Sequence, residues 1–85
     1  MTRDEAYEIL NRVFREVFDD ENITVNDETT ADDIEDWDSL EHINLVVAVE
    51  QAFKVKFTMG ETNVMKNVGE MVSTILEKLE KKAKS

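Results

Sequence analysis

The chain has 85 residues, no cysteine and a formal net charge of -10. A domain of this size buries only roughly 60–65% of the surface that its unfolded chain exposes, so we expect a thin core. Without cysteine it forms no disulfide, thiolate nucleophile or thiolate metal site. The polar N-terminus and the lack of a long apolar run predict no signal peptide and no membrane span, and we expect a soluble, cytoplasmic protein.

The negative charge is concentrated in one part of the chain. Thirteen Asp and Glu residues, and no Lys or Arg, lie from Glu16 to Glu50. Such a field repels nucleic acid and anionic lipid, and it steers the protein toward basic partner surfaces. We therefore expect no nucleic-acid partner and no membrane insertion. The alternative interpretation, that the charge only keeps a small protein soluble, stays open at this point.

The first predicted element is an amphipathic helix from about Arg3 to Phe18. Thr2 and Glu5 have the spacing of a capping box, which marks a helix start. Apolar residues then recur with helical period. These are Ala6, Ile9, Leu10, Val13, Phe14, Val17 and Phe18. From Asp19 to Trp37 the periodicity disappears, and the isolated apolar residues in this acidic stretch predict a long loop that is pinned across the core.

The second predicted helix begins at Ser39 and ends near Phe53 or Lys54. Asp38 is a good N-cap, and Glu41 three residues later makes a box-like pair. The helix has a broad predicted apolar face. Its members are Leu40, Ile43, Val46, Val47, Val49, Ala52 and Phe53. Residues 53–57 alternate between apolar and basic, which is typical of a short extended piece.

The last third of the chain predicts one short and one long helix. Gly60 to Lys66 allows at most a short helix, whereas Asn67 and Glu70 have the spacing of a cap and its third position. An apolar stripe from Val68 to Leu79 follows, and we expect fraying after Lys81. The predicted fold class is all-α: a small four-helix bundle of three longer helices and one short one, with a long loop between the first two. We expect a single domain over residues 1–85, with an ordered core of about 3–81.

Several side chains have an ordinary structural interpretation. The acidic loop fails the EF-hand pattern in both registers tried, because a loop starting at Asp20 has a valine at position 6 and one starting at Asp33 has a tryptophan at position 5, so we predict no metal site. His42 follows Ser39 on the same helix, where it cannot serve as a base for that serine, so we predict a solvent-facing histidine and no enzyme. Trp37 is predicted to anchor the end of the loop. The methionines at 59, 65 and 71 are predicted to fill gaps in the core.

Ser39 has two interpretations from the residues alone. It lies in the first turn of a helix, where its side chain faces solvent and where free N–H groups and the helix dipole favour a negative group. It is either a capping residue or a point of attachment for a phosphodiester, and position alone leaves both open.

The motif Asp38-Ser39-Leu40, followed by residues 45–50 (Leu-Val-Val-Ala-Val-Glu) and by Phe53, resembles acyl carrier proteins. The resemblance covers nearly the whole chain. It implies that a phosphopantetheinyl transferase attaches 4'-phosphopantetheine to Ser39, and that the terminal thiol carries acyl groups as thioesters. It also implies a carrier that performs no chemistry itself and presents its cargo to acyl-loading and acyl-processing enzymes with basic docking patches.

The resemblance further assigns residues to partner recognition. Asp38 matches the acidic residue that the family uses when the transferase docks. The helix after the serine is the family's recognition helix, which makes Leu40, Glu41, Val47 and Glu50 candidate partner contacts. We expect a monomer that meets each enzyme in turn.

Departures from the family pattern point to a specialised pathway. Asp36-Trp37 precedes the motif where members of ordinary fatty-acid synthesis usually have Gly-Ala, and Asn44 stands where an acidic residue is common. Lys54, Lys56 and Thr58 also depart from that pattern. The Trp-Asp-Ser-Leu-x-His form resembles stand-alone carriers of polyketide, modified-lipid or aminoacyl transfer systems, so we favour these over housekeeping fatty-acid biosynthesis. The alternative is a small acidic helical adaptor that binds a basic partner, with Ser39 only a helix cap.

Overall fold

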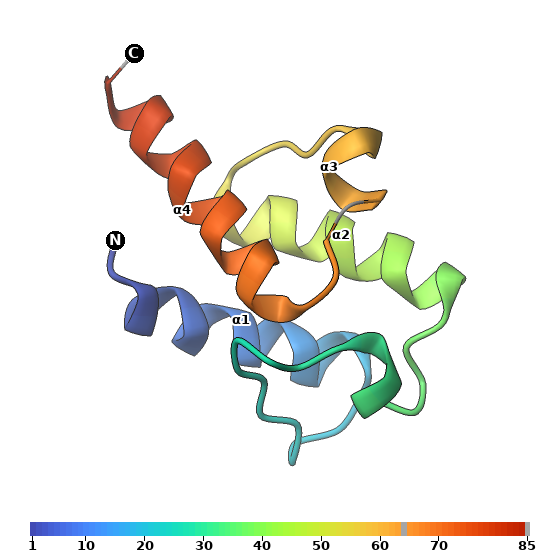
Figure 1. Ribbon diagram of the computed structural model, residues 1–85. Helices are drawn as coiled ribbons and strands as arrows, with labels where there is room; N and C mark the ends of the chain where they lie inside the picture. The colour runs from blue at the N-terminus through green and yellow to red at the C-terminus, as the bar shows by residue number, and fades with distance from the viewer. Residues whose placement is uncertain (64, 85) are drawn as a thin grey trace.

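The computed structural model describes residues 1–63 and 65–84 and shows a small helical bundle (Figure 1). Its elements are α1 (Arg3–Val17), α2 (Ser39–Phe53), α3 (Met59–Asn63) and α4 (Val68–Lys84), with one 3₁₀ turn, η1 (Ala31–Asp33), in the long loop. No strand occurs among the described residues, and the predicted all-α class with three long helices and one short helix is confirmed. Val64, in the segment predicted to hold the short helix, and Ser85, the end of the predicted domain, lie outside the described residues.

Local capping explains where the helices begin. The Thr2 side chain accepts a hydrogen bond from the Glu5 backbone N–H at 3.2 Å, and Glu5 Oε1 accepts one from the Thr2 N–H at 2.9 Å, which confirms the predicted capping box. Asn67 Oδ1 likewise accepts from the Glu70 N–H at 2.8 Å at the start of α4.

The expected fraying of the last helix after Lys81 was wrong, because α4 continues to Lys84. Basic side chains near a helix C-terminus interact favourably with the helix dipole. An ion pair of 3.2 Å between Lys81 and Glu77, one turn apart, adds a small contribution on the same helix.

The core lies where α1 packs against both α2 and α4 (Figure 1). Each of these helices contributes one buried stripe at helical spacing. The stripes are Ala6, Leu10, Val13 and Phe14 from α1, Leu45, Val49 and Phe53 from α2, and Val68, Met71, Val72 and Ile75 from α4. The core is thus shared by three helices and completed by Phe18, Val25 and Val55 outside them, while residues 59–61 of α3 are not buried.

The long loop is pinned to the bundle, as predicted. Val25 is buried, and its N–H donates to Asn11 Oδ1 of α1 at 2.7 Å. Arg15 Nε donates to the Ile23 carbonyl at 2.7 Å, and Thr29 is buried as well. Side chains of α1 therefore satisfy backbone groups of the loop and allow an irregular segment to cross the core.

The segment after α2 is not a strand. Lys54 takes a left-handed conformation (φ 58°) that ends α2, and no strand is assigned among the residues that follow it up to Thr58. Val55 is buried and Phe57 half-buried, while Lys56 is exposed. The alternation in the sequence therefore reflects which side chains face the core rather than pairing with another strand.

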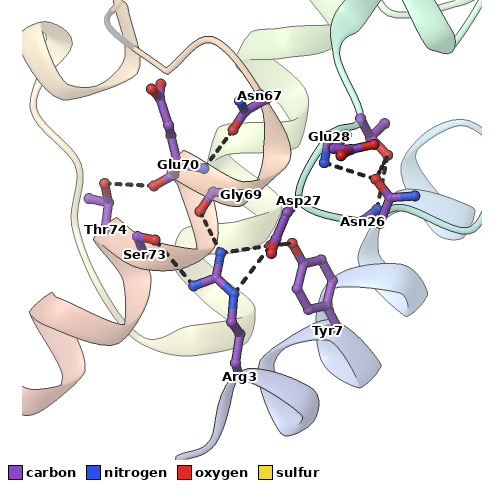
Figure 2. Close-up of polar contacts among 11 residues, drawn as sticks. Arg3, Tyr7, Asn26, Asp27, Glu28, Asn67, Gly69, Glu70, Ser73 and Thr74 are labelled. Carbon is purple, nitrogen blue, oxygen red and sulfur yellow. Dashed lines mark hydrogen bonds and ion pairs between the residues drawn. The ribbon is translucent and has the colours of Figure 1, made fainter.

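One cluster of polar contacts joins the start of α1, the middle of the loop and the start of α4. We call it the Asp27 corner; its members are Arg3, Tyr7, Asp27, Gly69 and Ser73. Figure 2 shows the Arg3 guanidinium between three partners: it donates to Asp27 Oδ1 at 2.7 Å, to the Gly69 carbonyl at 3.1 Å and to Ser73 Oγ at 3.1 Å. The Tyr7 hydroxyl donates to the same Asp27 oxygen.

The Asp27 corner also perturbs two ionisable groups. The hydrogen bond from Arg3, reinforced by the one from Tyr7, lowers the pKa of the Asp27 carboxyl. Burial, together with the Asp27 contact, raises the pKa of Tyr7 to about 12. The corner therefore holds a carboxylate in its charged form and a phenol in its neutral form.

Candidate functional site

The start of α2 leaves the Ser39 hydroxyl uncommitted. Asp38 has an extended backbone (φ -105°, ψ -173°), and its Oδ1 accepts from the Glu41 N–H at 2.8 Å, so Asp38 is the N-cap, as predicted. Ser39 is the first residue of α2 and is exposed. Its hydroxyl makes no hydrogen bond within the described part of the chain. Capping is therefore performed by Asp38, and the interpretation of Ser39 as only a cap loses its basis.

Trp37 anchors the end of the loop, as predicted. Its ring packs edge-on against Phe14 of α1, with 5.4 Å between ring centroids, and at 6.1 Å from the ring of Phe18. Edge-to-face aromatic pairs at this separation add to the free energy of burial. The residue that directly precedes Asp38 and Ser39 is thus fixed on α1.

The prediction that His42 faces solvent is only partly correct. The His42 ring is half-buried and stacks on Trp37, with 5.9 Å between centroids and 20° between planes. Trp37 Nε1 donates a hydrogen bond to His42 Nδ1 at 3.1 Å. Burial lowers the pKa of the His42 imidazole, which favours the neutral ring. Helical spacing alone did not reveal this contact, because it depends on how the loop returns toward α2.

An apolar hollow of about 630 Å³ opens beside Ser39. Met59, Met65 and Met71 line it together with Trp37 and Ile43, so we call it the methionine hollow. Ser39, Asp38 and His42 lie on its wall along the start of α2, and Lys66 and Asn67 on the side of α4. Methionine side chains adapt their shape easily, which suits a surface that accommodates a flexible ligand.

The three methionines do not share the role predicted for them. Met71 is only 2% exposed and fills the core, and Met65 is half-buried, both as expected. Met59 is 82% exposed, so its assignment to the core was wrong. Met59 begins α3, which lies outside the packing of the three long helices, and its side chain lines the hollow instead.

The predicted broad apolar face of α2 is in fact divided between core and surface. Of its predicted members Val49 and Phe53 are buried, whereas Leu40, Ile43 and Val47 are 67%, 62% and 46% exposed, and Ala52 is exposed as well. Leu45, which was not assigned to this face, is fully buried. We call Leu40, Ile43 and Val47 the α2 stripe. Members at i, i+3 and i+7 lie on one face of a helix, so the stripe is continuous on the surface. Ile43 was missed as a candidate contact, although its spacing from Leu40 and Val47 would have shown it.

The two candidate glutamates of α2 are partly withdrawn from solvent. Glu41 is half-buried and supplies the N–H that Asp38 caps. Glu50 is half-buried, and its Oε2 accepts from the Phe57 N–H at 2.8 Å. Glu50 thus fixes the segment between α2 and α3, a structural role that the sequence did not predict.

No group of three or more His, Cys, Asp or Glu residues suited to a metal ion occurs among the described residues. Within the same part of the chain, no helix is both long and apolar enough to cross a bilayer.

Comparison with known proteins identifies the class of molecule that carries such a site. No family model and no curated protein matches the chain. Among solved structures, the chain is similar to the solution NMR structure of a holo acyl carrier protein from Geobacter metallireducens, with 43% identity and a TM-score of 0.87. The match covers 93% of this chain and 91% of that one.

This likeness in both sequence and fold shows that the chain belongs to the acyl carrier protein family. It is therefore a carrier of acyl groups and not an enzyme. The cofactor of the family is 4'-phosphopantetheine.

Proposed function

We propose that Ser39 is the residue to which 4'-phosphopantetheine is attached, and that this chain presents acyl thioesters to the enzymes of a biosynthetic pathway. The observation that carries the proposal is the exposed Ser39 hydroxyl, which makes no hydrogen bond within the described residues while Asp38 caps the helix. A side chain that is not needed for capping is available to a modifying enzyme at no cost to the helix start.

The residues around Ser39 fit such an arm. A phosphodiester on Ser39 would lie at the N-terminus of a helix of 15 residues, where the dipole and the free N–H groups favour negative charge. The methionine hollow next to it offers an apolar surface for the part of the arm beyond the phosphate. When bound, the arm supplies the thiol that a chain without cysteine lacks.

Intact mass spectrometry tests this proposal directly. After incubation with coenzyme A and a broad-specificity phosphopantetheinyl transferase, we expect the mass to increase by one phosphopantetheinyl group. Ser39→Ala should abolish that gain completely. Thr58→Ala is the matched control, because Thr58 also carries a hydroxyl at a helix start, where its Oγ1 accepts from the Glu61 N–H at 3.2 Å. A gain that survives Ser39→Ala, or that Thr58→Ala removes, would refute the assignment.

We propose that partner enzymes dock on α2. The α2 stripe offers exposed aliphatic side chains, and the acidic stretch from Glu16 to Glu50 favours approach of enzymes with basic docking patches. Among the candidate contacts, Leu40 and Val47 have the exposure that docking requires. Asp38, Glu41 and Glu50 would contribute to docking through their negative charge. They also have structural roles, because the Asp38 side chain accepts from the Glu41 N–H and the Glu50 side chain accepts from the Phe57 N–H.

The pathway is proposed to be a specialised one rather than housekeeping fatty-acid synthesis. Trp37 and His42, which distinguish the motif of this chain from the ordinary one, form a contact pair directly beside Ser39. Residues that differ from the common pattern next to the attachment point are well placed to change which cargo or enzyme is accepted. The lack of cysteine is compatible with the reducing cytoplasm, where we propose that the carrier works as a monomer.

A further inference from the structure

The contact between Trp37 and His42 determines which nitrogen of the histidine carries its proton. An indole N–H only donates hydrogen bonds. Because Trp37 Nε1 donates to His42 Nδ1 at 3.1 Å, Nδ1 carries no proton, and the neutral ring is protonated on Nε2. Stacking of the two rings fixes the orientation of the imidazole. Trp37 therefore converts His42 into a neutral N–H donor of defined direction.

The Nε2 donor of His42 is not fully buried. Among the described residues, no buried side-chain nitrogen or oxygen lacks a hydrogen-bond partner. His42 Nε2 has no partner in that part of the chain, so in this half-buried residue the Nε2 atom itself is not enclosed. His42 lines the methionine hollow together with Ser39. The charged side chains on the same wall and rim are Asp38, whose Oδ1 already accepts from Glu41, and Lys66.

We propose that His42 is a positioning residue for the arm, and that its Nε2–H donates a hydrogen bond to a phosphodiester oxygen on Ser39. The inference rests on the proposed attachment at Ser39. Residues at i and i+3 on a helix are neighbours, with roughly 5–6 Å between their Cβ atoms. A phosphate bonded to Ser39 Oγ would therefore have a free oxygen near the His42 ring, which lines the same hollow. The neutral ring would make this bond without giving up the one from Trp37, so that both contacts would coexist beside the methionine hollow.

Nuclear magnetic resonance of the holo protein tests the contact, because His42 is the only histidine and the arm holds the only phosphorus. Intact mass first establishes that the arm is attached. Attachment should then raise the pKa of His42 relative to the apo protein, because a nearby negative charge favours the imidazolium form. The ³¹P resonance should shift with the same pH midpoint as His42, since a phosphodiester does not itself titrate in the range where histidine does.

Two substitutions separate the hydrogen bond from the ring. In the His42→Gln holo protein, the amide N–H replaces the donor, so the ³¹P resonance should stay near its wild-type position and lose its pH dependence. His42→Phe keeps an aromatic ring against Trp37 but removes both nitrogens, so the ³¹P resonance should move away from the wild-type position. Far-ultraviolet circular dichroism checks that each variant is folded.

The outcomes distinguish this inference from the proposed function. If the mass does not increase, both the proposed attachment at Ser39 and the proposed contact of His42 with the phosphate are rejected. If the mass gain occurs but the ³¹P resonance stays constant while His42 titrates, His42 does not contact the phosphate. The same conclusion follows if the His42→Phe resonance coincides with that of the wild type.

Discussion

The two sides of the long loop are attached to the bundle in different ways. At the Asp27 corner, an ion pair, side-chain hydrogen bonds and a close backbone contact hold the loop against α1 and α4 (Figure 2). At the end of the loop, Trp37 packs on aromatic rings, and the neighbouring surface opens into the methionine hollow. Beside Ser39, two local hydrogen bonds, the Asp38 cap and the Trp37–His42 contact, border an adaptable apolar surface, and no ion pair is present there among the described residues. The two regions therefore differ in the kind of contact, polar at the corner and largely apolar beside Ser39, rather than in the volume of the adjacent hollow, which is about 640 Å³ at the corner and about 630 Å³ beside Ser39.

The tightest point of the Asp27 corner is the approach of two backbones. The Gly69 N–H donates to the Asp27 carbonyl at 3.2 Å. A Cβ atom built on Gly69 would lie 2.7 Å from that carbonyl oxygen and 3.0 Å from Asp27 Cα. At Gly60, on the α3 side, a Cβ would meet only Thr58 Oγ1, at 3.9 Å. The two glycines of the chain therefore provide a matched pair for comparing the corner with the open side.

Gly69→Ala is expected to have the largest effect on stability. Because the added methyl group meets backbone atoms that cannot simply rotate away, we expect a loss of about 1–3 kcal/mol in the free energy of unfolding. Gly60→Ala should instead be neutral or stabilising by up to about 1 kcal/mol, since alanine is the better helix former. Urea denaturation followed by circular dichroism measures both. Equal losses in the two variants would show that the corner is no tighter than the open side.

Substitutions of Asp38 should separate its capping role from its charge at the open end. Asp38→Ala removes the cap of α2 and should cost about 1 kcal/mol of stability, besides slowing attachment of the arm. Asp38→Asn retains a capping oxygen and should leave stability nearly unchanged while still slowing attachment. Thermal unfolding and the initial rate of mass gain with the transferase are the two measurements. If Asp38→Asn is modified at the wild-type rate, the proposal that the Asp38 charge helps the transferase to dock is wrong.

The smallest expected effect is a pH dependence that originates in the Asp27 corner. The folded-state pKa of the Asp27 carboxyl lies below its ordinary value of 3.8, chiefly because of the bond from Arg3. As the pH falls, the unfolded chain therefore takes up the proton at this carboxyl before the folded chain does. The contribution of Asp27 to the free energy of unfolding is complete above the ordinary pKa and is lost as the pH falls through the folded-state pKa.

In Asp27→Asn, the free energy of unfolding should accordingly fall less than in the wild type when the pH is lowered from about 5 to about 3. Glu28→Gln is the control, because it removes the adjacent exposed carboxylate from the same loop without touching the corner. Urea denaturation at a series of pH values gives both slopes. Indistinguishable slopes for the two variants would mean that Asp27 is not held more firmly than its neighbour.

The helices and their starts could be predicted because they depend on nearby residues. The capping pairs Thr2–Glu5, Asp38–Glu41 and Asn67–Glu70 each span three positions, and all three appear as hydrogen bonds in the structure. The position of Ser39 at the start of α2 follows from the same local rule. The anchoring of the loop could be predicted in outline, because isolated apolar residues such as Val25 have to be buried somewhere.

Other features could not be predicted because they depend on segments that meet only in the fold. The apolar residues of α2 outnumber the positions that face the core, and only packing decides that Leu45 is buried while Ile43 is exposed. From the sequence, Glu50 resembles any exposed charged residue of a helix. Its structural role is visible only in the fold, where the Phe57 N–H donates a hydrogen bond to its side chain. No pattern in the sequence placed Met59 outside the core, since its exposure depends on where the fold positions α3.

The sequence by itself determined an all-α fold with a serine at a capped helix start and a resemblance to carrier proteins, because periodicity, capping and a short motif are properties of neighbouring residues. Only the tertiary structure decided what surrounds that serine. The partnership of Trp37 with His42 and the methionine hollow beside Ser39 arise where the loop, α2, α3 and the start of α4 converge. The physical reason is that hydrogen bonds and cavities require atoms to meet in space, whereas helix propensity requires only the right residues within one or two turns.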